Sequence, residues 1–137
     1  MLEKNKTVVK RMFDEAWNQG KLEVVDELLN PSSVDHNEPI GTDFPAHLKH
    51  NILSFRRAFP DLRFTIKELI GEGDLVSARV LMTGTHQNEF MGVPATGKSF
   101  SMQQMHMVRI ANGQGVEHWA VLDMPAMLRQ FGLQTQN

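Results

Sequence analysis

The spacing of apolar residues changes at Pro60, and this change sets what the chain can fold into. Before Pro60 the apolar residues recur every third or fourth position, which is the spacing of a helix with one buried face. After Pro60 they alternate with polar residues, as Leu62, Phe64 and Ile66 do, which is the spacing of a half-buried strand. Helices followed by consecutive strands predict an α+β domain with an antiparallel sheet, and not alternating βαβ units.

Three helices are predicted before Pro60. The first carries its apolar face on Val9, Met12, Phe13, Ala16 and Trp17 and ends at Gly20. The second spans residues 22–29 and ends at Asn30-Pro31, and the third spans residues 45–59. The polar stretch SSVDHNEPIGTDF between the second and third helices predicts a loop, with a brief strand at residues 34–36.

A meander of at least four strands is predicted after Pro60. Alternation marks strands around residues 62–66, 76–82, 100–110 and 116–122, and Asn112-Gly113 predicts a tight hairpin between the last two. Asp123 has the position of a helix N-cap, so a short final helix should begin there and end before Gly132. We expect residues 1–137 to form a single domain.

The stretch GVPATGKS, residues 92–99, matches the phosphate-binding P-loop pattern letter for letter. A P-loop needs a helix directly after it, because the N–H groups at the helix N-terminus bind the phosphates. The residues that follow Ser99 are FSMQQMHMVRI, which alternate as a strand does. We therefore interpret residues 92–99 as a connecting loop and expect no nucleotide.

Composition removes several classes of function. The net charge is −2, so no basic surface indicates a nucleic acid as partner. There is no cysteine, which excludes disulfides, a thiolate nucleophile and a cysteine-type zinc site. No apolar run approaches the roughly 18 residues of a membrane span, and the start of the chain is charged throughout. We expect a cytoplasmic protein with no membrane partner.

The hairpin brings two histidines together. If the turn is centred on Asn112-Gly113, Val108 lies opposite His118 and His106 lies opposite Ala120. His106 and His118 then point to one face as diagonal neighbours, with Gln104 beside them. Because that face is mostly apolar, the three polar groups either satisfy one another in a core or line a pocket between the sheet and the helices. In a pocket, the imidazoles could act as acid, base or carbonyl-polarising donor.

Other polar residues are weaker candidates. His86 stands at a strand end, where it could lie at the rim of such a pocket, and His36 follows Asp35 on the brief strand. Neighbours on a strand face opposite sides, so Asp35 is not expected to orient His36. Asp123 is expected to be the N-cap, with a role as a buried base as the alternative. His47 and His50 lie off the apolar stripe of the third helix, so we expect them to face solvent, and we expect no metal site.

The opposite face of the hairpin is also apolar, with Met105, Met107, Trp119 and Val121. Such a face is too apolar to be left in open water. It predicts a homodimer interface or a surface covered by another element.

Several motifs, in order along nearly the whole chain, resemble the SnoaL-like polyketide cyclase family, in particular its ester cyclase branch. They are AWNQGKLEVVDELL, VDH, AFPDLRFTIKELIGEGDLV, GTHQNEFMGVPATGKSFSMQQMHMVRIANGQ and VEHWAVLDMPAMLRQFG. The resemblance implies the nuclear-transport-factor-2-like fold, a cone in which a curved antiparallel sheet and N-terminal helices enclose a pocket. It also implies a homodimer through the outer face of the sheet, and it gives GVPATGKS a place as the family's own loop.

The resemblance implies a cofactor-independent, intramolecular aldol condensation of a polyketide methyl ester. In this family an aspartate removes the acidic proton, and a histidine lies near it. The family's histidines fall on His106 and His118, but the position of the aspartate falls on Ala120. Proton transfer has therefore moved to His106, His118 or Asp123, or the protein does not catalyse the aldol step.

We expect His106 to be the principal acid/base or carbonyl polariser, assisted by His118, in a pocket that binds a small hydrophobic carbonyl or aromatic compound. The alternatives are a non-catalytic binding protein, a dehydratase or isomerase that uses the same histidines, and a scaffold that works through its outer face. A tyrosine-dependent isomerase is disfavoured because the chain has no tyrosine. The expected substrate-binding residues are Phe13, Trp17, His36, Phe55, Phe59, Met82, His86, Phe90, Gln104 and Ala120.

Overall fold

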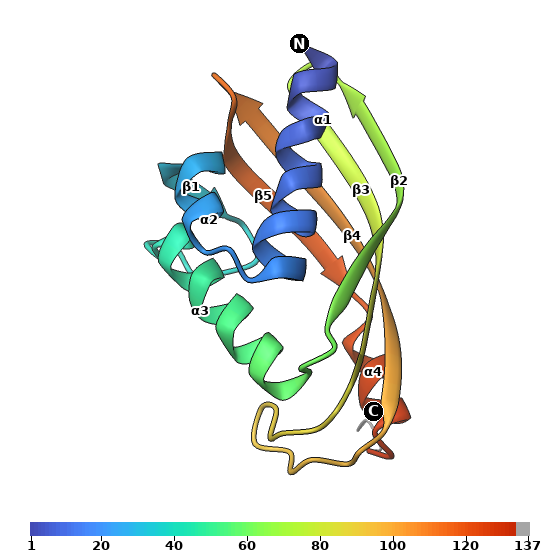
Figure 1. The fold of residues 1–137 in the computed structure, drawn as a ribbon. Helices are drawn as coiled ribbons and strands as arrows, with labels where there is room; N and C mark the ends of the chain where they lie inside the picture. The colour runs from blue at the N-terminus through green and yellow to red at the C-terminus, as the bar shows by residue number, and fades with distance from the viewer. Residues whose placement is uncertain (134–137) are drawn as a thin grey trace.

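The computed structural model describes residues 1–133 and contains one curved sheet with helices on its concave side (Figure 1). The strands are β1 (Leu29–Asp35), β2 (Arg63–Glu72), β3 (Leu75–Thr85), β4 (Ser99–Ala111) and β5 (Gln114–Leu122). The helices are α1 (Leu2–Arg11), η1 (Met12–Trp17), α2 (Glu23–Leu28), α3 (Phe44–Ala58) and α4 (Met124–Gln130). The predicted α+β architecture is confirmed.

The sheet has the order β1-β5-β4-β3-β2. Pairs from β2 to β5 are antiparallel, as the alternating sequence predicts, but β1 pairs with β5 in parallel. The strand predicted at residues 34–36 was therefore too short, and the second helix, predicted to end at Asn30-Pro31, already ends at Leu28. The strand begins at Leu29, and Pro31 is accommodated because β1 is an edge strand.

The first predicted helix is divided in two. α1 continues directly into η1, a wider π-helical segment that supplies Phe13 and Ala16 to the core. Segments of this kind are frequent at functional sites. The prediction that Gly20 ends this region agrees with its φ of 71°, a left-handed conformation that glycine adopts without strain.

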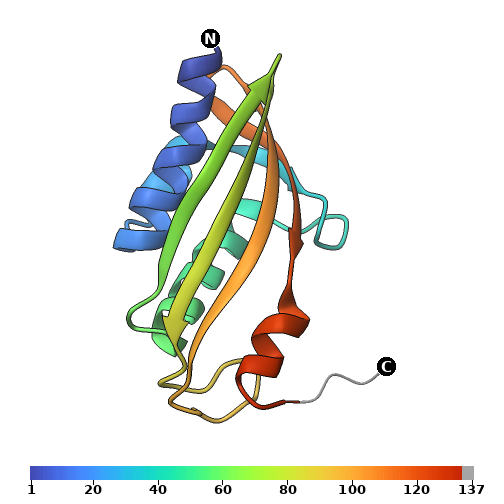
Figure 2. The same cartoon turned by 90° about the vertical axis from the view of Figure 1, so that its right-hand side faces the viewer.

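Two features close the lower end of the cone, as Figure 2 shows. Helix α4 packs against β4 and begins at Asp123, whose carboxylate accepts a hydrogen bond from Ala126 N, so the N-cap prediction is confirmed. The loop of residues 92–99 leads directly into β4. The prediction that a strand, and not a helix, follows GVPATGKS is confirmed, because Ser99–Ala111 form β4.

The core lies between the helices and the concave face of the sheet. Phe59, Ile52, Met82 and Met102 are among its largest fully buried side chains. No helix among residues 1–133 is both long and apolar enough to cross a membrane.

Candidate active site

A cavity of about 170 Å³ lies between the helices and β4, β5 and β1. Its walls are mostly apolar, and the contributions from the helices include Met12, Phe13, Trp17, Phe44, Leu48 and Phe55. Most of the polar groups come from the sheet and from the segment after β1, namely Asp35, Asn37, Glu38, Gln104, His106 and His118, and α3 adds Asn51. An apolar cavity with a few convergent polar groups is the usual form of a small-molecule site.

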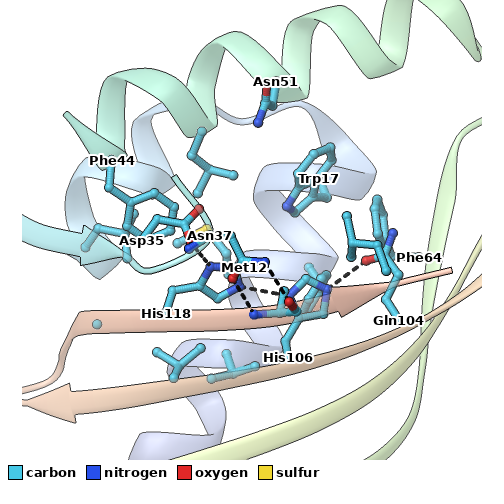
Figure 3. A pocket seen from close by; sticks show the side chains of 18 of the residues that line it. Met12, Trp17, Asp35, Asn37, Phe44, Asn51, Phe64, Gln104, His106 and His118 are labelled. Atoms are coloured by element: carbon cyan, nitrogen blue, oxygen red, sulfur yellow. Dashed lines mark hydrogen bonds and ion pairs between the residues drawn. The ribbon is translucent and has the colours of Figure 1, made fainter. Parts of the chain in front are cut away.

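Four of these polar side chains form one hydrogen-bonded chain (Figure 3). The distance from Asp35 Oδ1 to His118 Nδ1 is 3.0 Å, and from His118 Nε2 to His106 Nδ1 it is 2.9 Å. His106 Nε2 is 2.7 Å from Gln104 Oε1. The prediction that Gln104, His106 and His118 lie together is confirmed, and the structure adds Asp35.

Strand pairing places these residues. In the β4–β5 hairpin, Val108 lies opposite His118 and His106 opposite Ala120, as the turn at Asn112-Gly113 predicts. A bulge after Arg109 pairs Ile110 with Gly115, so the register is irregular near the turn. Across the other edge of β5, Asp35 is the register partner of His118, which puts the carboxylate beside the imidazole.

The acceptors at the two ends of this hydrogen-bonded chain determine which ring nitrogens carry protons. A carboxylate and an amide oxygen only accept hydrogen bonds, so His118 Nδ1 and His106 Nε2 must both carry protons. We assign the Gln104 oxygen to His106 because the amide nitrogen lies 3.3 Å from Met82 Sδ. The two ring nitrogens between them need a third proton, since two lone pairs would otherwise face each other. The imidazole pair therefore shares one positive charge, opposite the Asp35 carboxylate.

The surroundings place that charge on His118. Burial lowers the pKa of His106 to about 3, and the charge of His118 lowers it further, while Asp35 raises it. Burial acts to raise the pKa of Asp35, but the hydrogen bond and charge of His118 and the N–H of Asn37 outweigh it, and the pKa lies below its ordinary value. His106 is thus the neutral ring of the pair, and the shared proton lies on the His118 side.

Aromatic rings hold both imidazoles in place. The Phe13 ring meets His106 edge-on at 5.1 Å between centroids, and the Phe44 ring stacks on His118 at 5.4 Å. Rings at these distances fix the rotamers and keep bulk water from the chain, which strengthens its electrostatic interactions.

The segment after β1 closes one side of the cavity. The Asn37 side chain donates to Ala120 O at 2.6 Å and accepts from Ala120 N at 2.7 Å, as a neighbouring strand would. Glu38 Oε1 lies 3.0 Å from His47 Nε2. His47 was predicted to face solvent, but this contact leaves its side chain 31% exposed, whereas His50 is exposed as predicted.

Seven of the predicted catalytic or substrate-binding residues line the cavity. They are Phe13, Trp17, Phe55, Gln104, His106, His118 and Ala120. The chemistry assigned to each is a prediction that the geometry alone does not test.

The other predicted site residues lie elsewhere. His36 is on the outer face of the sheet, stacked on Trp119 at 4.8 Å, with Nε2 2.8 Å from Glu117 Oε2. It was misplaced because side chains alternate along β1, so only one of Asp35 and His36 can face the cavity. Asp123 was wrongly considered as a pocket base, because its exposed carboxylate caps α4.

A second cluster, beneath the cavity, accounts for the remaining misplaced residues. His86 is fully buried, its Nδ1 lies 3.0 Å from Thr96 Oγ1, and its ring stacks on Phe131 at 4.4 Å. Phe59 and Phe90 pack in the same cluster, and Met82 is buried behind Gln104. These residues pack below the cavity and do not line it.

Sequence reasoning missed Asp35 as a site residue. The signal that could have found it is the alternation along β1, together with a parallel pairing of β1 with β5. That pairing joins residues 83 positions apart, and no local pattern predicts it.

Comparison with known proteins identifies the family of the chain. The sequence profile of the SnoaL-like polyketide cyclase family matches residues 7–131. The aklanonic acid methyl ester cyclase DnrD of Streptomyces peucetius is 32% identical over 132 residues, covering 91% of this chain and 88% of that protein. The nogalonic acid methyl ester cyclase of Streptomyces nogalater is 29% identical over 129 residues, covering 85% and 90%.

Solved structures show the same fold. TsrD of Streptomyces laurentii superimposes with a TM-score of 0.86 at 25% identity, over 95% of this chain and 96% of that one. IdmH of Streptomyces antibioticus, a candidate polyketide cyclase, gives a TM-score of 0.79 at 35% identity, over 94% and 99%.

The curved sheet with helices on its concave side places the chain among the nuclear-transport-factor-2-like proteins. The chain belongs to the SnoaL-like polyketide cyclase family.

Proposed function

We propose that this protein closes a ring in a small, largely apolar carbonyl compound of the polyketide type, by proton transfer with its own side chains and without a cofactor. The observation that carries the proposal is the chain from Asp35 through His118 and His106 to Gln104 in the wall of an apolar cavity. Cyclases such as DnrD act on a methyl ester, and we extend that class of substrate to this chain.

The imidazole pair is suited to polarise a carbonyl. His106 Nε2–H is the one N–H of the pair that points to a neutral acceptor outside the pair, the Gln104 amide oxygen. A substrate carbonyl oxygen would accept this hydrogen bond in place of Gln104. The positive charge on His118 then stabilises the enolate that forms, as fixed dipoles and charges do in a water-poor site.

The cavity favours a neutral substrate, and a polyketide ester would enter it only in part. Its volume of about 170 Å³ is below the range of roughly 300–1,000 Å³ that is typical of drug-sized ligands. The lining residues include no lysine or arginine, and the charge of His118 is already paired with Asp35, so a carboxylate on the substrate would have no counter-charge of its own. A neutral ester or ketone is the form that this lining accommodates.

The test uses aklanonic acid methyl ester and nogalonic acid methyl ester as probes. Ring closure is an isomerisation, so the product has an unchanged mass and a new retention time and absorption spectrum. The wild-type protein should form such a product, and His106→Gln should lower kcat about 100-fold or more, with Kd little changed. No product from either ester, or an unchanged kcat in His106→Gln, would contradict the proposal.

A second candidate is a non-catalytic binding protein. Ala120 favours it, because this residue lines the cavity opposite His106 and offers no carboxylate there. Trp17 lines the cavity, so its fluorescence reports binding, and Trp119→Phe removes the background from the outer face. Binding of a methyl ester without its consumption would support this candidate.

We also propose that two copies pair through the outer face of the sheet. Met105, Met107 and Val121 are 48%, 41% and 73% exposed there, next to the stacked pair of His36 and Trp119. A two-fold axis through this face would bury the same apolar side chains on both copies.

A further inference from the structure

The cavity contains two carboxylates, although position 120 is an alanine. Asp35 and Glu38 both line it, one at the end of β1 and the other in the segment that follows. Either could remove a proton from a substrate carbon, so the geometry of each decides between them.

The two oxygens of Asp35 differ. Oδ1 accepts hydrogen bonds from His118 Nδ1 and Asn37 N, both at 3.0 Å. Among residues 1–133, no hydrogen bond reaches Oδ2, and Oδ2 is not among the buried side-chain atoms that lack a partner, which are Ser33 Oγ and His86 Nε2. Since Asp35 lines the cavity, Oδ2 has a free lone pair that a substrate can reach.

Glu38 is differently placed. Its Oε1 lies 3.0 Å from His47 Nε2 on α3, and its side chain is 31% exposed, against 9% for Asp35. Glu38 also has no hydrogen bond to His106 or His118. A base must act next to the group that stabilises the resulting enolate, and Asp35 alone of the two contacts the charged imidazole.

We infer that Asp35 Oδ2 is the base that removes the carbon-bound proton of the substrate, in place of the carboxylate that position 120 lacks. This inference rests on the proposed function. His118 keeps Asp35 ionised and in position through Oδ1, and the small side chain of Ala120 leaves room for the substrate beside His106.

The step is balanced without a further reactant. The C–H bond breaks, its proton goes to Oδ2, and its electron pair becomes an enolate held by the imidazole pair. The enolate carbon forms the new C–C bond to a second carbonyl of the same molecule. The resulting alkoxide takes the proton back from Oδ2, so Asp35 is restored.

The test uses 5-nitrobenzisoxazole, a small neutral bicycle that reports any base in an apolar cavity. Removal of its ring C–H proton breaks the N–O bond and releases a coloured cyanonitrophenolate, with no other reactant. The wild-type protein should open this ring faster than acetate at the same concentration, and Asp35→Asn should be slower than wild type by about 100-fold or more. Asp123→Asn is the matched control, because asparagine also caps a helix and Asp123 lies outside the cavity.

Two measurements keep the test decisive if Asp35→Asn folds poorly. In the wild type, the rate should fall at acidic pH with a midpoint below the ordinary range of an aspartate. This midpoint should persist in His106→Gln, whereas a base at His106, whose pKa is also lowered, would lose its activity in that variant. In the double variant Asp35→Asn with Ala120→Asp, the carboxylate on the neighbouring strand β5 should restore the rate at least tenfold.

The inference is overturned by a wild-type rate no greater than that of acetate, by an unchanged rate in Asp35→Asn, or by a loss in Glu38→Gln instead. The ester cyclisation assay tests the proposed function separately from the base. Ring opening of the bicycle that depends on Asp35, without cyclisation of either methyl ester, would sink the proposed function and leave the base assigned. Cyclisation that is unaffected in Asp35→Asn would do the reverse.

Discussion

At the scale of the residue, the site depends on where a single positive charge lies between two imidazoles. The pKa of His106 is lowered to about 3 by burial first and by His118 second, so the charge is on His118, next to Asp35. An arrangement of this kind gives the cavity an ionised carboxylate and a fixed cation together, although the surroundings are apolar. Removal of one member leaves the other buried without its partner.

The lowered pKa of His106 predicts a pH-dependent stability. Between pH 6.5 and about 3 the unfolded chain binds a proton at this residue and the folded chain does not, so the free energy of unfolding falls as the pH falls. The slope should be up to about 1.4 kcal/mol per pH unit. Urea unfolding of His106→Asn across this range should show that slope reduced, and His50→Asn, at an exposed site on α3, serves as the control.

Asp35 affects the free energy of unfolding in a lower pH range than His106 does. Its folded pKa lies below the ordinary value, so its contribution to stability is complete above about pH 4 and is lost as the pH falls through the folded pKa. In the His106→Asn variant, any acid destabilisation that is left should therefore begin below about pH 4. An unchanged slope near pH 5 in that variant would contradict the assignment of a buried, neutral His106.

The sequence predicts part of the site at this scale. His106, His118 and Gln104 follow from counting outward from one turn, because hairpin register is a local property. Asp35 does not follow, because it reaches His118 through a parallel pairing at long range. His36 was predicted in place of Asp35, although side chains alternate along β1 and only one of the two can face the cavity.

At the scale of the element, two asparagines act as single-residue strands. Asn18, just after η1, accepts from Phe64 N at 2.7 Å and donates to Phe64 O at 2.9 Å, which ties the helical layer to the start of β2. Asn37 does the same with Ala120 on β5. Hydrophobic periodicity predicts neither contact, because each asparagine side chain makes the two hydrogen bonds that the backbone of a neighbouring strand would make.

Asn18→Ala should therefore destabilise the fold. The variant leaves the N–H and C=O of buried Phe64 without partners, and a loss of about 2 kcal/mol is expected. Asn37→Ala should cost less, because its contacts are exposed and water can replace them. Thermal unfolding of both variants checks this order, and a larger loss in Asn37→Ala would contradict it.

Element boundaries were predicted well where local sequence determines them and poorly where distant contacts do. The third helix, the hairpin and the N-cap at Asp123 were predicted within a residue or two from caps and turns. The strand β1 was shortened and η1 was not foreseen, because tertiary pairing and packing decide them.

At the scale of the whole molecule, the outer face predicts self-association. If two copies bury Met105, Met107 and Val121 between them, the mass in solution is that of a dimer, and Met107→Lys shifts it towards a monomer. Light scattering coupled to size exclusion measures this. Lys67→Glu, at an exposed position on β2, is a control for a change of charge alone, and a monomeric wild type would contradict the prediction.

The architecture as a whole was the most predictable level. The change of period at Pro60 and the order of the elements predict an α+β domain before any side chain is placed, and the family resemblance adds the cone. The parallel edge strand is the one departure from the predicted antiparallel sheet, and it is the strand that carries Asp35.

The most direct test of the central claim is a long-range ¹⁵N–¹H correlation spectrum of the histidine rings at neutral pH. His118 should show both nitrogens protonated, and His106 should show a protonated Nε2 and an unprotonated Nδ1. Asp35→Asn should remove the shared proton and leave both rings neutral. Two neutral rings in the wild type, or a His106 that carries the charge, would contradict a site built on an ionised Asp35 and a charged His118.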